Sequence, residues 1–555
     1  MARSTNLLKG FLMKNKKGIN LLTKYGALFL LTVIIIAVGF SGVEIYKEEI
    51  LHIDPDFEYK EQKTTYLSSE RIDTLNPVIS QSEDVYYLSK LIYSSLFVYD
   101  ENLNVKPDLV KSYEINTEKA YIEITLRDDV KWHNGKNLKA ADVSFTINAM
   151  KSAGSTCPYY EKIKKINSAF ARSKDVVTIY FNNNYNCSLD ELVFPIVPST
   201  QYASVYQFNG AVDFKPIGTG RFEYKSYNKL KQLRLVPYED YYGQPAKKNI
   251  TVTILPDESL SSNMMEINSV SCYVDNAANR KSIASDKKLK IYDFPSNSVE
   301  FIVFNTSDVI LSSKDIRHAL AYGINTEKIL NNAYMGDGIL TDTIYYPNYL
   351  GSKDTGDYYS YDINNSKTIF EKAGYKDTNG DGILEDVFNE PVVLDILVNE
   401  KNATRNSAAR IIKSDLEQIG IKANILSVPQ DEYLMQIKNK NFDILLTGYT
   451  IEESYDLRDF YNGKNEWGYS NYDLQMASRE LDRLYSPEQY KDNYAALKEL
   501  LMDELPYYPL CYKKMSLIGL QTFEADKLPM FNNIYMNCET WSWSKVIEKN
   551  NSEEQ

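Results

Sequence analysis

The chain has 555 residues, of which 43% are hydrophobic and 25% are charged. This composition is typical of a folded protein, and the length predicts at least two lobes because one hydrophobic core rarely organises so many residues. The formal net charge of -13 argues against a nucleic-acid-binding protein, since a phosphate backbone requires a clustered basic surface. The chain has too few cysteines for disulfides to be the main source of stability of the fold. Cys157 and Cys187 are the best candidates for a pair, but the sequence leaves their pairing open.

The start of the chain predicts export through a membrane. Residues 1–25 are basic and lack any acidic residue, and residues 26–43 are almost wholly apolar. A basic flank of this kind stays in the cytoplasm while the segment after the apolar run is exported. The run is of intermediate length, so it is either a cleaved signal peptide or a membrane anchor helix. Residues 44–63 follow as a charged linker, and residues 547–555 form a polar tail that we expect to be disordered.

The first half of the folded region has a mixed pattern. Residues 121–127 and 176–182 alternate apolar and polar side chains, as antiparallel strands do, and residues 250–255 and 299–304 are further short apolar strands. Residues 140–150 have helical spacing, with a start near Asp142. This half is therefore predicted to be α+β.

The second half reads as an α/β unit. Its predicted elements alternate in the order strand 392–398, helix 403–419, strand 421–428, helix from Asp431 to about Lys438, and strand 442–447. Gly420 stands where a helix C-cap belongs. Short connections between such elements require right-handed crossovers and a parallel sheet.

Parallel sheets bind ligands beyond the carboxyl ends of their strands. Residues 399–402 and 448–456 are the loops at that edge. The second loop carries Tyr449, Glu452 and Glu453, and an aromatic surface beside carboxylates suits a ligand with an amine and an apolar portion. A solvated acidic loop is the alternative interpretation.

An ordered series of motifs runs through the exported part of the chain. The segments are Thr74–Pro77, Leu91–Leu96, Lys106–Leu109, Ile124–Arg127, Val130–Gly135, Ala141–Val143, Ile217–Gly220, Ile316–Ile324 and Ala373–Tyr375. With them, the chain resembles the family 5 bacterial extracellular solute-binding proteins, a group that binds oligopeptides, dipeptides or nickel, from about Thr64 to Trp543. One departure is Arg221, which stands where proline is usual. Gly135, Gly218 and Gly220 lie between strands, where we expect turns with positive φ.

The resemblance implies a two-lobed periplasmic-binding-protein-like fold of the type II, cluster C kind, α/β with an α+β portion. Lobe I would comprise residues 64–300 and 518–546, with an inserted subdomain at about 98–210. Lobe II, an α/β unit, would comprise residues 301–517. The lobes would close over the ligand by hinge motion, driven by contacts that the ligand makes with both.

The resemblance also implies a function and candidate ligand contacts. In peptide-binding relatives an aspartate shortly after a Gly-Trp pair holds the amino terminus of the peptide. Here Gly448-Tyr449 is the corresponding pair, and Glu452, next to Glu453, is the corresponding acid. A buried carboxylate needs a partner, which an ammonium supplies. Tyr512 is a further pocket candidate.

The resemblance implies partners and a location as well. We expect a monomer on the extracytoplasmic face of the bacterial membrane, anchored or secreted, that captures a short peptide and delivers it to an ABC permease and ATPase. Many relatives carry a lipid on a cysteine directly after the apolar run, but the first cysteine here is Cys157. No lipid anchor is therefore expected.

Three alternatives compete with peptide import. A nickel-chelate binder would need imidazoles or a bound chelator, and the chain offers His52, His133 and His318; we expect no metal and no cofactor. Residues 377–382 resemble the start of a calcium loop, but Phe388 occupies its twelfth position, which favours a polar turn. An enzyme is not expected, because GxSxG, P-loop and HExxH motifs are absent. A membrane-tethered peptide sensor would have the same binding lobes.

Overall fold

The structure is a computed structural model that describes residues 64–182, 188–202, 204–209, 214–229, 231–267, 269–275, 289–451, 457–481 and 486–543. The apolar segment 26–43, the linker, the tail, Cys187, Glu452 and Glu453 lie outside these residues. Among the helices that the structure describes, none combines the length and the apolar character needed to cross a bilayer.

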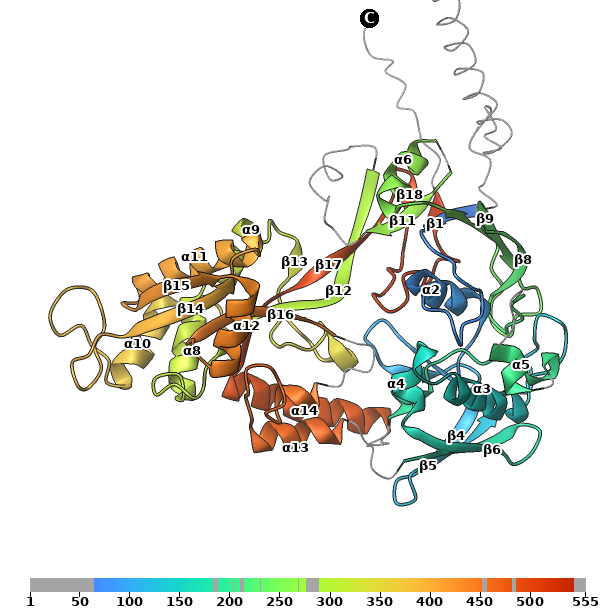
Figure 1. Cartoon of the computed structure of the whole chain (residues 1–555), viewed down its shortest axis with the longest axis horizontal. Coiled ribbons are helices and arrows are strands. Elements are labelled where there is room, and N and C mark those ends of the chain that lie inside the picture. Colours follow the sequence, from blue (N-terminus) through green and yellow to red (C-terminus); the bar gives the residue numbers. More distant parts are fainter. Residues whose placement is uncertain are drawn as a thin grey trace, which may run out of the picture.

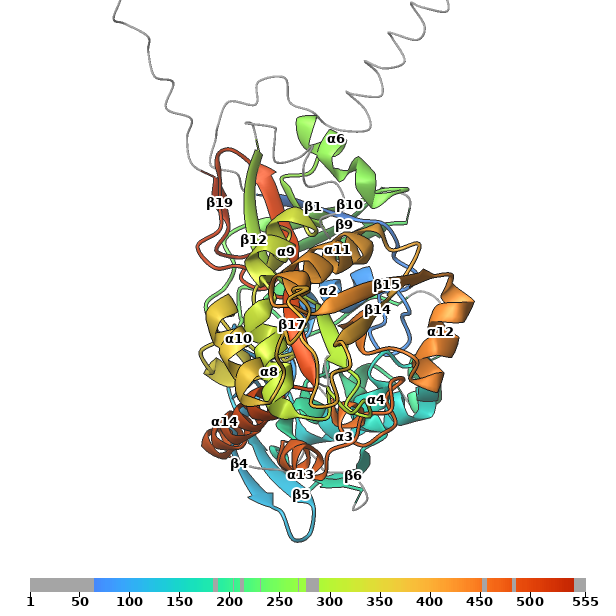
Figure 2. The ribbon, with the colours of Figure 1, turned by 90° about the vertical axis from the view of Figure 1, so that its left-hand side faces the viewer.

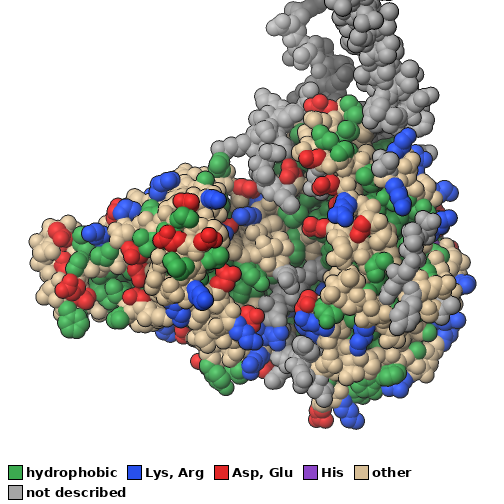
Figure 3. Space-filling view, viewed as in Figure 1, with side chains coloured by type: hydrophobic (Ala, Val, Ile, Leu, Met, Phe, Trp, Pro, Cys, Tyr) green, Lys and Arg blue, Asp and Glu red, His purple; other side chains and the backbone are tan. Residues whose placement is uncertain are grey.

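Two lobes of mixed helix and sheet lie side by side (Figure 1). Lobe I, on the right of Figure 1, contains the first part of the chain, and lobe II, on the left, contains the α/β part. Two long antiparallel strands, β12 (Leu289–Phe304) and β17 (Tyr507–Leu520), run from one lobe to the other. Basic and acidic side chains of the described residues are interspersed over the face shown in Figure 3.

Lobe I is built on two four-stranded sheets. The first has the order β1-β10-β9-β8 and the second the order β4-β5-β7-β6. Their strands are β1 (Thr64–Ser69), β4 (Val110–Asn116), β5 (Tyr121–Leu126), β6 (Ile166–Ala171), β7 (Val176–Phe181), β8 (Phe222–Asn228), β9 (Gln232–Pro237) and β10 (Asn249–Ile254). The helices are α2 (Glu83–Ile92), α3 (Ala140–Ala153), α4 (Tyr160–Ile163), α5 (Val205–Asn209) and α6 (Ser261–Glu266), and β2 (Phe97–Tyr99) and β3 (Val105–Pro107) form a hairpin.

The predicted elements of this half are confirmed. β5 and β7 are antiparallel neighbours, because their alternating residues place one apolar face against α3. Helix α3 begins after Lys139, and Asp142 lies in its first turn, where its carboxylate accepts the Lys139 amide at 2.9 Å. The strand predicted at 299–304 is the end of the longer β12.

Lobe II is the predicted α/β unit. The parallel strands β14 (Val393–Asn399), β15 (Lys422–Val428) and β16 (Ile444–Thr450) alternate with α11 (Ala403–Gln418) and α12 (Gln430–Asn439). The other elements are α8 (Lys314–Gly323), α9 (Thr326–Asn332), β13 (Gly338–Ile339), α10 (Ile363–Lys372), α13 (Tyr472–Glu480) and α14 (Pro487–Glu504). Apolar residues of α8, α10 and α11 cover one face of the sheet, and those of α12 cover the other. Figure 2 shows α12 and α10 on opposite sides of β14 and β15.

Two details of this unit differ from the sequence prediction. Pro429, not Asp431, is the N-cap of α12, and Asp431 lies in the first turn, where an acid stabilises the helix dipole without being the cap. Strand β16 continues to Thr450, three residues past the predicted end, because it pairs with β12 through Ser298. Gly420 follows the C-cap of α11 with a φ of +89°, as expected.

Strands β12 and β17 belong to one seven-stranded sheet of order β11-β17-β12-β16-β14-β15, in which β13 also pairs with β17. Strand β11 (Cys272–Asp275) lies in lobe I, whereas β14 to β16 lie in lobe II. The β12–β17 ladder is interrupted by register shifts between Pro295 and Val299 and between Glu300 and Phe301. The predicted lobe boundaries at 300/301 and 517/518 fall inside these strands. A small sheet of β18 (Phe523–Glu524) and β19 (Ser542–Trp543) follows.

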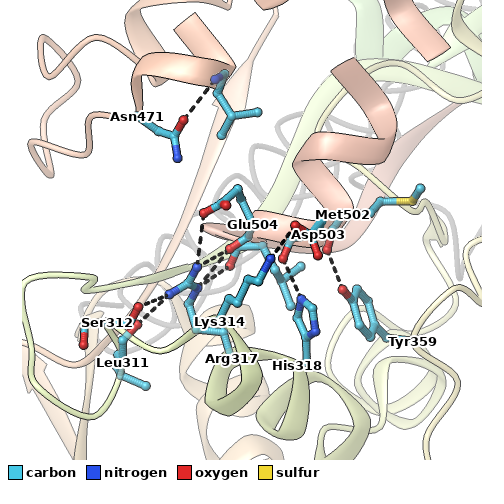
Figure 4. Close-up of polar contacts among 12 residues, drawn as sticks. Leu311, Ser312, Lys314, Arg317, His318, Tyr359, Asn471, Met502, Asp503 and Glu504 are labelled. Carbon is cyan, nitrogen blue, oxygen red and sulfur yellow. Dashed lines mark hydrogen bonds and ion pairs between the residues drawn. The ribbon is translucent and has the colours of Figure 1, made fainter. Parts of the chain in front are cut away.

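The motif at Ile316–Ile324 has a structural role. The Arg317 guanidinium, whose residue is 3% exposed, donates to the carbonyls of Glu504 and Leu505 at the end of α14 and to those of Leu311 and Ser312. His318 Nε2 lies 2.7 Å from Asp503 O (Figure 4). The last carbonyls of a helix have no partner within the helix. The motif therefore fastens α8 to the carboxyl end of α14.

The prediction of positive φ is confirmed for one of the three glycines and wrong for the other two. Gly135 has a φ of +80° in an open turn. Gly218 and Gly220 do not have positive φ; instead, a Cβ on either residue would overlap the Ile92 carbonyl at the end of α2. These two residues are glycines because the backbone passes directly against α2.

Candidate functional site

Lobe I contains a cavity of about 280 Å³ beside α2. Its walls come from the end of α2, the β2 hairpin, the Gly220–Phe222 segment and the loop 532–539. Aromatic rings make up much of the lining: Tyr93, Tyr99, Tyr159, Phe194, Phe222, Tyr241 and Tyr535. A concave site with apolar walls and a few placed polar groups is the usual form of a small-ligand site.

Four polar side chains of the cavity wall carry a buried atom without a hydrogen-bond partner. They are the Tyr93 and Tyr159 hydroxyls, the Asn532 amide nitrogen Nδ2 and the Asn533 amide oxygen Oδ1. Tyr93 and Asn532 are only 3% and 4% exposed. Buried polar groups are nearly always paired, because an unpaired one costs about 1–3 kcal/mol. These atoms are buried within the wall and have almost no accessible surface, so they do not face the cavity.

The charged side chains of the wall already have partners in the protein. Arg221 forms an ion pair with Glu539 at 2.6 Å and lies over the Tyr241 ring. Asp108 Oδ1 accepts the Tyr242 hydroxyl at 2.6 Å. Lys90 Nζ donates to the Tyr86 hydroxyl at 2.8 Å and to Asn532 O. The two basic side chains, Lys90 and Arg221, equal in formal charge the two acidic side chains, Asp108 and Glu539.

Burial governs the titration of these groups. It raises the pKa of Asp108 to about 6, although the Tyr242 hydrogen bond opposes the shift. It also lowers the pKa of Lys90 well below its ordinary value, and the neighbouring Lys162 adds to that effect. Charged forms are disfavoured in this cavity because they lose hydration.

The cavity lies close to lobe II. Tyr99 interacts electrostatically with Tyr349, and Leu350 N donates to Asn102 O at 2.9 Å. The Tyr346 and Phe531 rings lie 5.3 Å apart. The segment around residues 346–350 thus reaches from lobe II to the cavity side of lobe I.

At the end of lobe II nearest the hinge strands, a buried carboxylate is fully paired. Glu300, which is 2% exposed, accepts Arg405 Nε at 2.7 Å and Nη2 at 3.1 Å, Lys513 Nζ at 2.9 Å, and the Tyr334 hydroxyl at 3.1 Å. Burial raises the pKa of Glu300, but the bonds from Arg405 and the charge of Lys513 outweigh it, so the pKa lies below its ordinary value. A Cβ at Gly448 would meet Arg405 Nη2 at 2.5 Å, so this glycine makes room for the pair.

Residues 104–470 match the family described as bacterial extracellular solute-binding proteins, family 5 Middle. The chain belongs to this family. The match covers helices and strands of both lobes.

Relatives of this family 5 protein cover most of its length. It is 26% identical to the oligopeptide-binding protein AppA of Bacillus subtilis (strain 168), over 85% of this chain and 89% of the relative. It is 25% identical to the dipeptide-binding protein of Escherichia coli (strain K12), over 69% of this chain and 75% of the relative. In structure it is similar to a nickel ABC transporter protein from Bacillus halodurans, with a TM-score of 0.71 and 17% identity over 87% of this chain and 100% of the other. This last likeness shows the two-lobed fold.

The residues of this family 5 protein that were predicted to contact the ligand differ in their environments. Tyr449 lies on β16, 38% exposed, with its ring 4.9 Å from Phe460 in an edge-on arrangement. Tyr512 lies on β17, is 0% exposed, and its hydroxyl donates to Ile344 O at 2.6 Å. Glu452 and Glu453 lie outside the described residues. Their roles stay predictions, and of the two residues that the structure describes, neither Tyr449 nor Tyr512 lines the lobe I cavity.

The histidines of the folded region have backbone partners. His133 Nδ1 accepts Gly218 N at 3.2 Å, and its Nε2 donates to Gly220 O at 3.0 Å. Burial lowers the pKa of His133 to about 4, so the ring is neutral near neutral pH. His133 therefore fixes the Gly218–Gly220 segment beside α2, and His52 lies outside the described residues.

The turn at residues 377–385 is polar, as predicted. Its carboxylates accept backbone amides: Asp377 those of Gly380 and Gly382, and Glu385 that of Thr378. Carboxylate oxygens of Asp377, Asp381 and Glu385 lie within 4.8 Å of one another.

Sequence reasoning missed most of the cavity. Asn532 and Asn533 lie in a loop with no strand or helix periodicity, and Lys90 and Asn532 are 442 residues apart in the chain. The only sequence feature that pointed to the cavity was Arg221, which stands where proline is usual in the family and which lines the cavity.

Proposed function

We propose that the chain is the substrate-binding component of a bacterial ABC importer and captures short peptides between its two lobes. Its membership of a family of extracellular solute-binding proteins supports this function. So do two relatives whose names describe oligopeptide and dipeptide binding. Its partners are a permease and an ATPase, and it acts as a monomer.

The observation that carries the proposal is the lobe I cavity with its aromatic walls and its polar lining residues. A peptide supplies amide donors and acceptors together with side chains that suit aromatic walls. The hinge is the β12–β17 ladder, whose register shifts at Pro295 to Phe301 interrupt an otherwise regular pair of strands. Closure would bring Tyr449 and the acids Glu452 and Glu453 toward the ligand, with Glu452 holding its amino terminus.

The protein acts on the extracytoplasmic face of the membrane, with residues 26–43 as its anchor or export signal. The basic segment before this apolar run supports that orientation. Mass spectrometry of the protein from its native host should find no acyl chain. An acyl-modified form would contradict this mode of anchoring.

The test is native mass spectrometry of the full-length chain, purified without refolding and then denatured to release its cargo. A family of co-purified short peptides is expected. A single non-peptide species or a metal chelate would move the function to another solute. Peptide cargo together with unimpaired peptide uptake in a deletion strain would favour a tethered sensor instead of an importer.

A further inference from the structure

The loop between α10 and β14 forms the end of lobe II that points away from lobe I, at the left of Figure 1. The loop carries two large apolar side chains in a row, Val387 and Phe388, which are 73% and 80% exposed. In Figure 3, hydrophobic and acidic side chains lie next to one another at this end of the molecule. Single exposed apolar residues are ordinary, but two adjacent ones on a projecting loop form a surface that a partner can bury.

The tip of this loop is held in one conformation. Asp386 Oδ1 accepts the amide of Phe388 at 2.8 Å and that of Glu390 at 3.0 Å, and Asp386 N donates to Glu390 O at 2.9 Å. Behind the turn, Lys376 and Glu385 exchange two backbone hydrogen bonds. A preformed surface loses little conformational entropy when it binds a partner, so the tip is suited to docking.

Acidic side chains surround the apolar pair. Residues 371–390 contain six acidic and two basic side chains. Asp386 precedes Val387 directly, and Glu390 follows Phe388 after one residue. The tip is therefore apolar at its centre and negatively charged at its rim.

A second apolar side chain of the same kind lies at this end of lobe II. Val309 is 87% exposed and follows Asp308 in the chain. Tyr375 interacts electrostatically with both Asp308 and Asp386, so the two aspartates lie on the same side of the lobe. The surface thus extends beyond the turn and keeps the same combination of apolar and acidic groups.

The partner that fits this surface has an apolar pocket with basic residues at its rim, because opposite charges favour the encounter. An anionic membrane fits poorly, since its headgroups would repel the acids beside the tip. We propose that Val387 and Phe388 dock into such a pocket on the extracytoplasmic face of the importer's permease. This inference rests on the proposed function and refines it by naming the surface of lobe II that meets the transporter.

The test measures peptide uptake in a deletion strain of the native host that carries the full-length chain or a variant. Phe388→Ser should lower the initial rate of uptake at least about tenfold, because a buried aromatic anchor carries much of the energy of an interface. Peptide binding by the purified variant should be unchanged, since Phe388 does not line the lobe I cavity. Unchanged uptake would overturn the inference and leave the proposed function intact. A deletion strain that takes up peptides as well as the wild type does would contradict the proposed function itself.

Tyr472→Ser is the matched control. Tyr472 lies on α13 and is 72% exposed, so this variant removes an equally accessible aromatic ring from another part of lobe II. It should leave uptake unchanged. An equal loss of uptake in Tyr472→Ser and Phe388→Ser would show that the effect does not belong to the tip and would overturn the inference.

The charge of the rim is tested separately. Asp386→Asn together with Glu390→Gln removes two acids, while the asparagine keeps an oxygen that can accept the Phe388 amide. This double variant should lower the rate of uptake, whereas Asp473→Asn, at an exposed position beside Tyr472, should not. An unchanged rate in the folded double variant would overturn the assignment of a basic partner.

Two further measurements detect other occupants of the surface. Sedimentation velocity detects a second copy of this chain, and flotation with phosphatidylglycerol vesicles detects a lipid surface. Phe388→Ser should behave as the wild type does in both. Dissociation of a dimer, or loss of vesicle binding, in this variant would overturn the assignment to the permease.

Discussion

In lobe II, the buried carboxylate of Glu300 has Arg405, Lys513 and Tyr334 around it. In lobe I, by contrast, Tyr93, Asn532 and Asn533 each have a buried polar atom without a partner, within the wall of the cavity. Both regions are buried and polar. The first is a completed network and the second is not. Two buried polar regions can therefore differ in whether their hydrogen-bonding capacity is filled, and burial and polarity alone do not show which of the two is the case.

Glu300→Gln tests whether the lobe II network is structural, and it carries the largest expected effect. The substitution removes the negative charge that pairs with Arg405, whose side chain is only 17% exposed. Because a buried arginine would then lack its partner, the free energy of unfolding should fall by about 3–5 kcal/mol. Urea denaturation measures this. Lys513→Gln is the control and should cost at most about 1 kcal/mol, since Lys513 is 46% exposed. Equal losses in both variants would contradict the view that Glu300 and Arg405 form the core of the network.

Glu452→Gln tests whether lobe II also contributes a charged group to ligand binding. If Glu452 binds the peptide amine, lobe II also offers a charge to the ligand, and the substitution should weaken binding of a free-amine peptide by about 2–5 kcal/mol. Calorimetric titration with a peptide and its N-acetylated form measures the effect. Both changes should weaken binding comparably, and unchanged binding in both would remove Glu452 from the site.

Gly218→Ala tests the close approach of the backbone at Gly218 to the end of α2, beside the lobe I cavity. A Cβ there overlaps the Ile92 carbonyl, so the variant should lose about 3 kcal/mol of stability. At Gly135 a Cβ would meet no atom within 4 Å, and the only cost is the φ of +80°, which disfavours alanine. Gly135→Ala should therefore lower the free energy of unfolding by about 1 kcal/mol. Thermal unfolding of the two variants should rank them in this order; the reverse order would argue against the close approach of α2.

Asp108→Asn tests the pH dependence of stability, which has opposite signs for Asp108 and Glu300. The pKa of Asp108 is raised to about 6 in the folded chain, so the native state binds more protons than the unfolded state between about pH 4 and pH 6. Wild-type stability therefore falls by about 3 kcal/mol as the pH rises across this window, at about 1.4 kcal/mol per unit of pKa shift. The variant, which still accepts the Tyr242 hydroxyl, should not show this loss.

Glu300 has a lowered pKa. Its contribution to stability is present above its unfolded pKa, and it is lost as the pH falls through the lower folded value. Chemical unfolding at a series of pH values separates the two carboxylates. A wild-type curve with no decline between pH 4 and pH 6 relative to Asp108→Asn would contradict the assignment for Asp108.

The sequence predicted lobe II in detail because its information is local. Helix α11 and strands β14 and β15 each carry their own periodicity and end signals, such as Gly420. The motif with Arg317 was likewise assigned to the fold, where it caps α14. The cavity was missed because its parts are joined only in three dimensions: Tyr93 ends α2, and Asn532 follows hundreds of residues later. Nothing local distinguishes Asn532 from an asparagine in any surface loop.

The sharing of β12 and β17 between the lobes has a consequence for dissection of the protein. Leu289 to Pro295 pair with Lys514 to Leu520, while Phe301 to Val303 pair with Tyr507 to Pro509. Neither lobe can be excised as a separate fragment without cutting through a strand that completes the other. Evolution and engineering must therefore change the two lobes in place, because gene fragments for the individual lobes do not correspond to independent folding units.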